Sequence, residues 1–191
     1  MAEPIFTVAN QLTMLRMALV PLLVLLALAG EFAWALVVFV VAGLTDALDG
    51  YIARHGHQVT QLGATLDPIA DKVMVGTTYA VLTWSSAVSC PMPPWLTVTL
   101  LFRDTMLIVG VLAVNLTVGR RVFYPSRLGK ASSALNMFTG GAALAVNAAG
   151  DCLPALRWLY VVTLLVLIAS TVQYVYASSE RRSKADPPDA P

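Results

Sequence analysis

Six apolar segments, separated by polar or Pro- and Gly-containing stretches, constrain the fold more than any other feature of the sequence. A helix needs about 20 apolar residues to cross the ~30 Å hydrocarbon core of a bilayer. The segments approach or exceed this length, at roughly 12–29, 32–53, 66–88, 95–118, 129–149 and 154–177. With 58% hydrophobic and 12% charged residues, and a mean hydropathy of +0.73, the chain is unlike a soluble domain of this size. We therefore expect an all-α, polytopic membrane protein with six transmembrane helices.

The first apolar segment also resembles the core of a secretory signal peptide, because "MALVPLLVLLALAG" follows Arg16. Its polar lead is long and contains Glu3, however, and the next apolar segment follows almost at once. We therefore expect this segment to be retained as the first transmembrane helix.

The distribution of cationic residues predicts the orientation, because cytoplasmic loops of membrane proteins carry an excess of Lys and Arg. On the opposite side the only cation is Arg157, near the start of the last segment. We expect both termini in the cytoplasm (or the equivalent compartment) and a polar cavity facing that side. The six-helix domain is predicted at 10–178, after an N-terminal cytoplasmic segment 1–9 and before a disordered cytoplasmic tail 179–191. The cations on the predicted cytoplasmic side are Arg54, Arg120, Arg121, Arg127, Lys130, Arg181, Arg182 and Lys184.

The two cysteines, Cys90 and Cys152, fall in loops on the non-cytoplasmic side of this layout. A disulfide is chemically permitted in that compartment. Two free thiols are the alternative, because the sequence does not show whether the pair meets the required geometry.

Four aspartates interrupt the apolar pattern in "LTDALDGYIARHGHQVTQLGATLDPIADK", residues 44–72. Asp46 and Asp49 are three positions apart and Asp67 and Asp71 are four apart, so each pair lies on one face of a helix. Consecutive antiparallel spans would bring the pairs together near the cytoplasmic interface. Close carboxylates are costly unless a cation neutralises them, and oxygen ligands favour hard cations. The stretch therefore predicts a site for Mg²⁺, Mn²⁺ or Ca²⁺, with one ion or two about 3.5–4 Å apart.

A structural role can be suggested for some of these aspartates, but each such role explains only one of the four. Asp49 and Gly50 could form a turn, and Asp67 before Pro68 could cap a helix. The spacing does not fit an EF-hand, in which ligands occupy alternate positions around a central Gly. A shared function is therefore the simpler interpretation for all four.

Small and basic residues beside the aspartates indicate a phosphate ester as the ligand. Gly50 and Gly63 leave room for a ligand to approach the backbone. Arg54 offers a planar guanidinium that suits phosphate oxygens. Carboxylates, a metal and an arginine at a membrane interface would fit a substrate with a diphosphate head and lipid tails.

The stretch follows the pattern D-x2-D-G-x2-A-R-x8-G-x3-D-x3-D, which resembles the signature of the CDP-alcohol phosphatidyltransferases at every fixed position. The likeness extends over nearly the whole chain, through "NQLTMLRMALVP", "RDTMLI" and "PSRLGKASSALN". The resemblance implies six helices around a cavity open to the cytoplasm, two divalent cations (Mg²⁺ or Mn²⁺) per active site and a homodimer. It gives no role to nucleic acid. The fixed positions are Asp46, Asp49, Gly50, Ala53, Arg54, Gly63, Asp67 and Asp71.

The same resemblance implies the reaction and the role of each residue. The family transfers a phosphatidyl group from CDP-diacylglycerol to an acceptor hydroxyl and releases CMP. Asp71 is implied as both a metal ligand and the catalytic base that takes the hydroxyl proton. The other implied metal ligands are Asp46, Asp49 and Asp67, and the implied CDP-binding residues are Gly50, Ala53, Arg54 and Gly63.

For the acceptor, the segments "LTDALDGYIAR", "LGATLDPIADK" and "RDTMLI" most resemble the CMP-forming cardiolipin synthases of the family, which use phosphatidylglycerol. Phosphatidylglycerophosphate synthases, which use glycerol 3-phosphate, usually have R-E in place of Arg103-Asp104 and another Arg about two turns later. Residues 108–115 of this chain contain no cation. Phosphatidylglycerol is therefore the favoured acceptor, and glycerol 3-phosphate is the alternative. The candidate acceptor-binding residues are Arg103, Arg127 and Lys130.

Other roles stay open for these acceptor candidates. A structural salt bridge between helices explains Arg103-Asp104 equally well. Lys130 could instead extend to lipid headgroups at the interface. Two other classes of protein are more distant alternatives: intramembrane prenyltransferases, whose acidic motifs lie far apart in longer chains, and cation transporters. A transporter would need a polar path across the membrane, but the non-cytoplasmic halves of the segments are almost entirely apolar.

Overall fold

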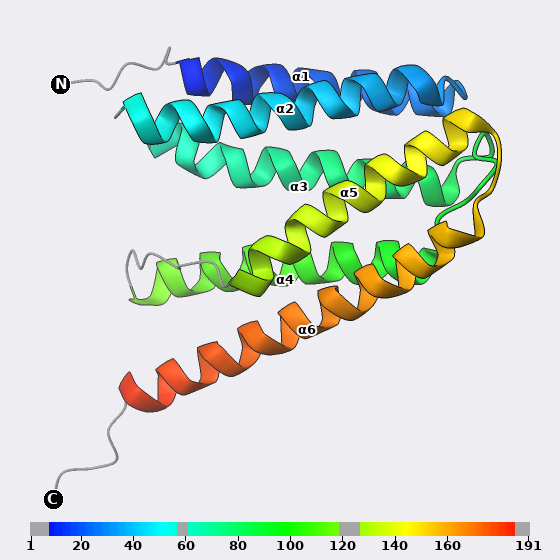
Figure 1. Cartoon of the computed structure of the whole chain (residues 1–191). Coiled ribbons are helices and arrows are strands. Elements are labelled where there is room, and N and C mark those ends of the chain that lie inside the picture. Colours follow the sequence, from blue (N-terminus) through cyan, green and yellow to red (C-terminus); the bar gives the residue numbers. More distant parts are fainter. Residues whose placement is uncertain (1–7, 57–60, 119–126, 186–191) are drawn as a thin grey trace, which may run out of the picture.

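A computed structural model describes the backbone of residues 8–56, 61–118 and 127–185, and the side chains of 14–45, 69–109, 128–174 and 176. This backbone forms six α-helices and contains no strand, which confirms the all-α prediction. Figure 1 shows the turns 29–31, 85–93 and 150–153 at one end of the bundle, and the start of α1 and the end of α6 at the other. The helices are α1 (Val8–Leu28), α2 (Phe32–Gly56), α3 (Gln61–Trp84), α4 (Pro94–Val118), α5 (Arg127–Ala149) and α6 (Pro154–Ala185).

The helix boundaries differ most from the predicted segments in α1, α3 and α6. The first helix begins before residue 12, and α6 continues to Ala185, well into the tail that was predicted to be disordered. The third helix runs over 61–84 instead of 66–88. It ends where the Ser85 hydroxyl accepts a hydrogen bond of 3.2 Å from the Ala87 N–H, which diverts the backbone from the helix. An apolar run therefore located this helix but did not fix its ends.

Two glycines end helices at the turns. Gly30 follows α1 with φ +80°, and Gly150 follows α5 with φ +79°, a conformation in which a Cβ would be strained. At the first turn, the Gly30 and Glu31 N–H groups donate to the carbonyls of Ala27 and Leu26, at 3.2 and 2.9 Å. These two bonds form a Schellman motif, which satisfies carbonyls at the end of α1 and turns the chain into α2.

Side chains from all six helices form the core. The helices α1 and α5 each pack against both α2 and α3, α4 packs against α3 and α6, and α6 also packs against α5. Glycines allow α5 to approach closely: a Cβ on Gly141 would lie 3.4 Å from the Phe39 ring, and one on Gly140 would lie 3.3 Å from the Tyr79 ring. The Tyr79 hydroxyl donates to the Asn136 carbonyl at 2.9 Å. The small residues Gly140 and Gly141 thus allow close packing of α5 against α2 and α3.

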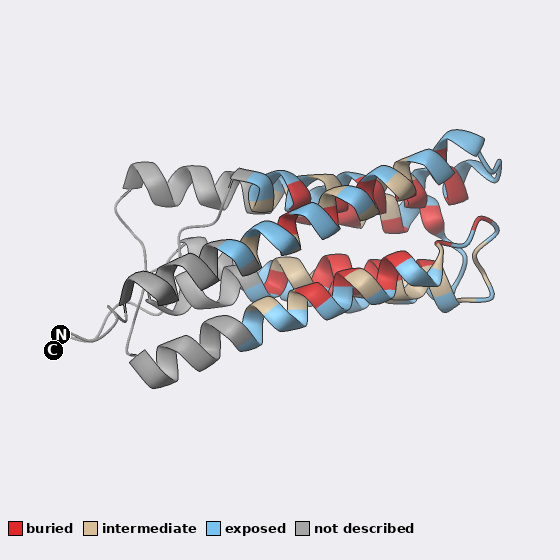
Figure 2. Cartoon of the chain, turned by 90° about the horizontal axis from the view of Figure 1, so that it is seen from below, coloured by how far each residue is buried: buried red, intermediate tan, exposed pale blue. Residues whose placement is uncertain are grey.

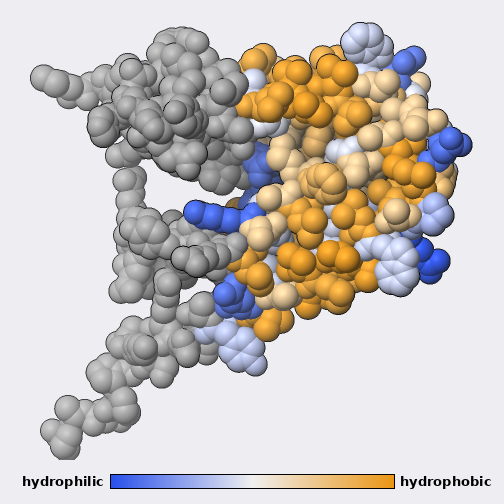
Figure 3. Space-filling view, in the orientation of Figure 1, coloured by the Kyte–Doolittle hydropathy of each residue, from blue (hydrophilic) through white to orange (hydrophobic). Residues whose placement is uncertain are grey.

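The bundle exposes many large apolar side chains on its outer surface and buries some polar ones among the apolar residues of its core. Large side chains such as Leu25, Phe102 and Trp158 are 64%, 61% and 74% exposed. The inward-facing sides in Figure 2 hold the buried residues, among them Thr139 and Thr163, whose hydroxyls are 2.7 Å apart. Figure 3 shows apolar residues over most of the described surface. This distribution is the one expected for a bundle surrounded by lipid.

Length and composition identify one described helical segment that could cross a membrane by itself, Pro154–Tyr174. Two other described segments, Met14–Leu28 and Phe32–Thr45, are apolar but shorter. The six helices are therefore an observation, whereas six transmembrane spans remain a prediction.

A disulfide joins Cys90, between α3 and α4, to Cys152, between α5 and α6, with their Cα atoms 5.6 Å apart. This observation decides between the two alternatives that the sequence left open for the cysteines. Asn147 of α5 holds the same region, because its side chain accepts from the Cys90 N–H at 2.9 Å and donates to the Cys90 carbonyl at 3.2 Å. The turns 85–93 and 150–153 are therefore fixed to each other and to α5.

Reduction of this disulfide is expected to destabilise the protein by about 2–4 kcal/mol, because the bond closes a loop across a sequence separation of 62 residues. Thermal unfolding in detergent, followed by tryptophan fluorescence, should show a lower Tm with reductant than without. A variant carrying both Cys90→Ser and Cys152→Ser should unfold at the lower temperature with or without reductant. An equal Tm for the oxidised protein and this variant would show that the bond contributes no stability.

Candidate functional site

The four predicted metal ligands lie on two antiparallel helices, with Asp46 and Asp49 on α2 and Asp67 and Asp71 on α3. Asp46 lies about 15 Å along the helix axis from the end of α2 at Gly56. Asp71 lies at the same distance from the start of α3 at Gln61. Figure 1 shows these helix ends at the same end of the bundle. The backbone therefore places both aspartate pairs at one level, opposite the disulfide.

The side chain of Asp71 is described and is half-buried. Those of Asp46, Asp49 and Asp67 lie outside the described side chains, so their convergence remains a prediction. Among the side chains that are described, no three or more His, Cys, Asp or Glu residues form a cluster able to bind a metal. That result does not test the predicted site, since only one of its four ligands belongs to the described set.

The predicted substrate-binding residues are placed by their helices. Gly50, Ala53 and Arg54 lie in the last part of α2, and Gly63 lies in the first turn of α3. Arg127 is the first residue of α5. The side chains of Ala53, Arg54 and Arg127 are outside the described set, whereas Lys130 is described and exposed.

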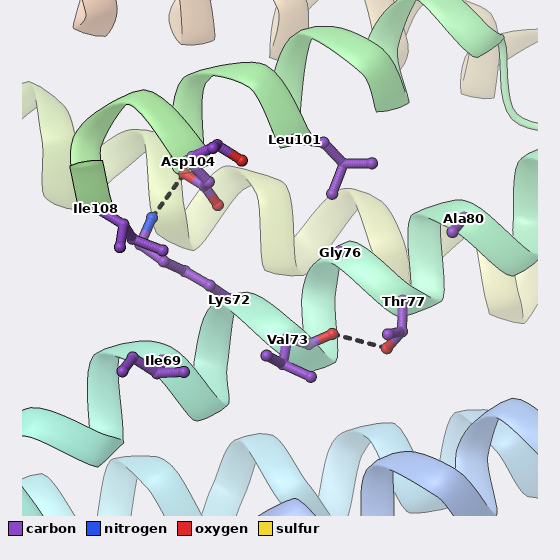
Figure 4. A pocket seen from close by; sticks show the side chains of 10 residues that line it. Ile69, Lys72, Val73, Gly76, Thr77, Ala80, Leu101, Asp104 and Ile108 are labelled. Atoms are coloured by element: carbon purple, nitrogen blue, oxygen red, sulfur yellow. Dashed lines mark hydrogen bonds and ion pairs between the residues drawn. The ribbon is translucent and has the colours of Figure 1, made fainter. Parts of the chain in front are cut away.

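Arg103 is buried, at 6% exposure, and takes part in a network that connects three helices. Its guanidinium donates to Asp104 of the same helix at 2.9 Å and to Ser170 of α6 at 3.1 Å. Asp104 in turn lies 2.6 Å from the ammonium of Lys72 on α3. Figure 4 shows the Lys72–Asp104 pair between α3 and α4. Arg103 and Asp104 therefore have structural partners, and acceptor binding by Arg103 remains untested.

Sequence reasoning missed two members of this network, Lys72 and Ser170. A signal for Lys72 was present, because a lysine inside an apolar segment needs an anion, and Asp104 is the aspartate of the next segment. No pattern distinguished Ser170 from the other hydroxyl residues.

Arg16 is a second cation that sequence reasoning left without a role. It is fully buried, at 0% exposure. The short turn at 29–31 places it level with the part of α2 around Thr45, next to the first aspartate pair. Arg16 therefore lies at the level of the predicted metal site.

Replacement of Asp104 by Asn is expected to destabilise the fold by about 3–5 kcal/mol, because two cations then lose the carboxylate that neutralises them. Ser170→Ala is the matched control, since it removes one hydrogen bond of Arg103 and leaves the ion pairs. Its expected cost is about 1 kcal/mol. Denaturant unfolding in detergent measures both, and equal stability of the two variants would contradict a structural role for the ion pairs.

Comparison with known proteins identifies the family to which this chain belongs. The family model of the CDP-alcohol phosphatidyltransferases matches residues 6–177, nearly the whole chain. The chain belongs to the CDP-alcohol phosphatidyltransferase family. This membership confirms the resemblance that the aspartate signature indicated.

Curated relatives of this CDP-alcohol phosphatidyltransferase have two kinds of name. A cardiolipin synthase (CMP-forming) of Streptomyces coelicolor is 39% identical over 141 residues, which cover 69% of this chain and 61% of that protein. A cardiolipin synthase (CMP-forming) of Rattus norvegicus is 44% identical over 111 residues, which cover 58% of this chain and 35% of that protein. A probable phosphatidylglycerophosphate synthase of Mycobacterium tuberculosis is 35% identical over 133 residues, covering 65% of this chain and 59% of that protein.

The matched region is thus about a third of the rat relative and about three fifths of the two bacterial ones. The two names differ in the product, cardiolipin or phosphatidylglycerophosphate. The similarity therefore supports a phosphatidyltransferase and leaves its product to be decided.

Proposed function

We propose that this CDP-alcohol phosphatidyltransferase transfers the phosphatidyl group of CDP-diacylglycerol to phosphatidylglycerol, forming cardiolipin and CMP. The observation that carries the proposal is the complete aspartate signature, split between α2 and α3 at one level of the bundle. Relatives named for cardiolipin synthesis support the choice of product.

The donor set fits a pair of hard divalent cations, Mg²⁺ or Mn²⁺. It consists of oxygen ligands alone, from two antiparallel helices whose acidic positions lie at the same level. Asp46, Asp49, Asp67 and Asp71 would hold the ions. Bound there, divalent cations would neutralise the diphosphate and stabilise the charge that develops on the departing CMP.

The residues of the chain have distinct roles in the proposed transfer. Asp71 accepts the proton of the acceptor hydroxyl as its oxygen forms a bond to the phosphorus next to diacylglycerol. The bond between this phosphorus and the bridging diphosphate oxygen breaks, and CMP leaves with that oxygen. Arg54 binds the diphosphate, while Gly50, Ala53 and Gly63 leave room for the CDP moiety.

Phosphatidylglycerol is preferred over glycerol 3-phosphate because of the cations that are available to bind a small phosphorylated acceptor. Arg103 already donates to Asp104 and Ser170, and residues 108–115 contain no cation. Of the candidate acceptor-binding residues, glycerol 3-phosphate would then depend on Arg127 and Lys130 at the start of α5. The relative named phosphatidylglycerophosphate synthase keeps this second acceptor as the alternative.

We further propose that all six helices span the membrane and that the aspartate level faces the cytoplasm. The apolar outer surface supports the spans. The disulfide supports the orientation, because it lies at the opposite end and disulfides persist in oxidising compartments. A homodimer in the membrane is proposed from the family alone.

Purified protein supplied with CDP-diacylglycerol and one acceptor at a time tests the choice of acceptor. Mass spectrometry of the lipid product should show cardiolipin with phosphatidylglycerol, and little incorporation of glycerol 3-phosphate. Efficient formation of phosphatidylglycerophosphate without cardiolipin would overturn the proposed acceptor but leave the reaction class intact.

A further inference from the structure

A groove between α3 and α4 opens on the outer, apolar surface of the bundle. Its volume is about 330 Å³, which is within the range of small-molecule sites. Residues of α3 from Ile69 to Ala80 and of α4 from Leu101 to Ile108 line it. Figure 4 shows Leu101 extending from α4 toward α3 and Lys72 extending from α3 to Asp104 of α4.

The walls of the groove are apolar and accessible from outside. Ile69, Val73, Leu101 and Ile108 are each about 40% exposed. The groove follows α3 for about 16 Å, which is close to half of the ~30 Å hydrocarbon core. One acyl chain of a single leaflet would match both this length and this apolar lining.

A polar group lies near one end of the groove. Lys72 and Asp104 line it there, and buried Arg103 shares the same carboxylate. Two cations thus meet one anion, so the three side chains together carry a positive charge. The Lys72 ammonium has three donors, and its side chain is 23% exposed, so it can also bind a phosphate oxygen.

The charged end is also the end closest to the predicted catalytic residues. Lys72 follows Asp71 directly in α3, and the two side chains are about 100° apart around the helix. A lipid with its phosphate at Lys72 would have its headgroup hydroxyls near Asp71. An anionic phospholipid therefore fits the groove in charge, length and position.

We propose that this groove holds one acyl chain of the acceptor phosphatidylglycerol, with the lipid phosphate at Lys72. That this lipid is the acceptor rests on the proposed function. That it binds in the groove rests on the charge, length and position of the groove itself.

Photolabelling tests the occupant without turnover. The full chain is placed in phosphatidylcholine nanodiscs containing a trace of phosphatidylglycerol with a diazirine in one acyl chain, and no CDP-diacylglycerol. Mass spectrometry after illumination should find label on residues 69–80 and 101–108. Unlabelled phosphatidylglycerol should compete with the label, and additional phosphatidylcholine should not.

Two substitutions separate the apolar walls from the charged end. Val73→Trp fills the groove and should abolish the label, whereas Val98→Trp on exposed α4 surface outside the groove should preserve it. Lys72→Met keeps the aliphatic stem and leaves Asp104 paired with Arg103. It should weaken the competition by phosphatidylglycerol about tenfold.

The KM for phosphatidylglycerol should rise by a similar factor in Lys72→Met, with the KM for CDP-diacylglycerol unchanged. Equal labelling of the groove and of other outer faces would overturn the inference, as would full labelling of Val73→Trp. Cross-links between two copies of the chain through the groove would also overturn it. Specific labelling by a protein that uses only glycerol 3-phosphate would preserve the lipid site and reject the proposed acceptor.

Discussion

Replacement of Asp71 by Asn is expected to lower the rate of CMP release by about 10²–10⁴-fold, the usual contribution of a positioned general base. The amide keeps the shape of the carboxyl group but cannot accept the proton of the acceptor hydroxyl. Binding of CDP-diacylglycerol and folding should change much less than turnover, because the half-buried position is filled by a side chain of nearly the same size. Steady-state kinetics and a lipid-binding assay measure the two effects separately.

Asp46→Asn is the matched control, because it removes a predicted metal ligand without removing the predicted base. Its main effect should be a weaker affinity for the divalent cation, seen in Mg²⁺ titrations of activity and in Mn²⁺ binding by electron paramagnetic resonance. Excess metal should restore much of the activity of Asp46→Asn but little of that of Asp71→Asn. If both variants need more metal to the same degree and excess metal rescues both, Asp71 has no separate role as a base.

Exhaustive removal of divalent cations is expected to abolish CMP release completely and reversibly. Four carboxylates brought to one level of a bundle repel one another and lose hydration, so without cations they should neither stay close nor bind a diphosphate. Chelation should therefore stop the reaction, and added Mg²⁺ or Mn²⁺ should restore it. A parallel fluorescence measurement of Tm distinguishes loss of the ions from irreversible unfolding. Full turnover in metal-free buffer would exclude the predicted site.

The sequence predicted the number and approximate position of the helices well, because the length of each apolar run determines them. Six apolar runs correspond to six helices, and the cluster of Pro91, Pro93 and Pro94 marks the break between α3 and α4. The exact ends depended on local hydrogen bonds, such as that of Ser85, which a hydropathy pattern does not contain. Pairing of Cys90 with Cys152 depended on how two turns meet, and only the structure brings them together.

The sequence predicted which residues belong to the candidate site better than it predicted the ion pairs and hydrogen bonds between helices. Helix periodicity alone shows that aspartates spaced i, i+3 or i, i+4 share one face of a helix. Partners that come from distant helices, such as Lys72 with Asp104 and Arg103 with Ser170, depend on packing between α3, α4 and α6. The contacts of Gly140 and Gly141 with the Phe39 and Tyr79 rings likewise depend on how α5 packs against α2 and α3.

A doubly labelled CDP-diacylglycerol, with one isotope in the cytidine and another in the acyl chains, tests phosphatidyl transfer most directly. Purified protein is incubated with this donor, Mg²⁺ and phosphatidylglycerol, and labelled CMP and labelled lipid products are quantified from the same sample. We expect one molecule of acyl-labelled cardiolipin for each molecule of labelled CMP, and neither product when phosphatidylglycerol is omitted. CMP released with phosphatidic acid as the lipid product, or no CMP at all, would contradict phosphatidyl transfer to this acceptor.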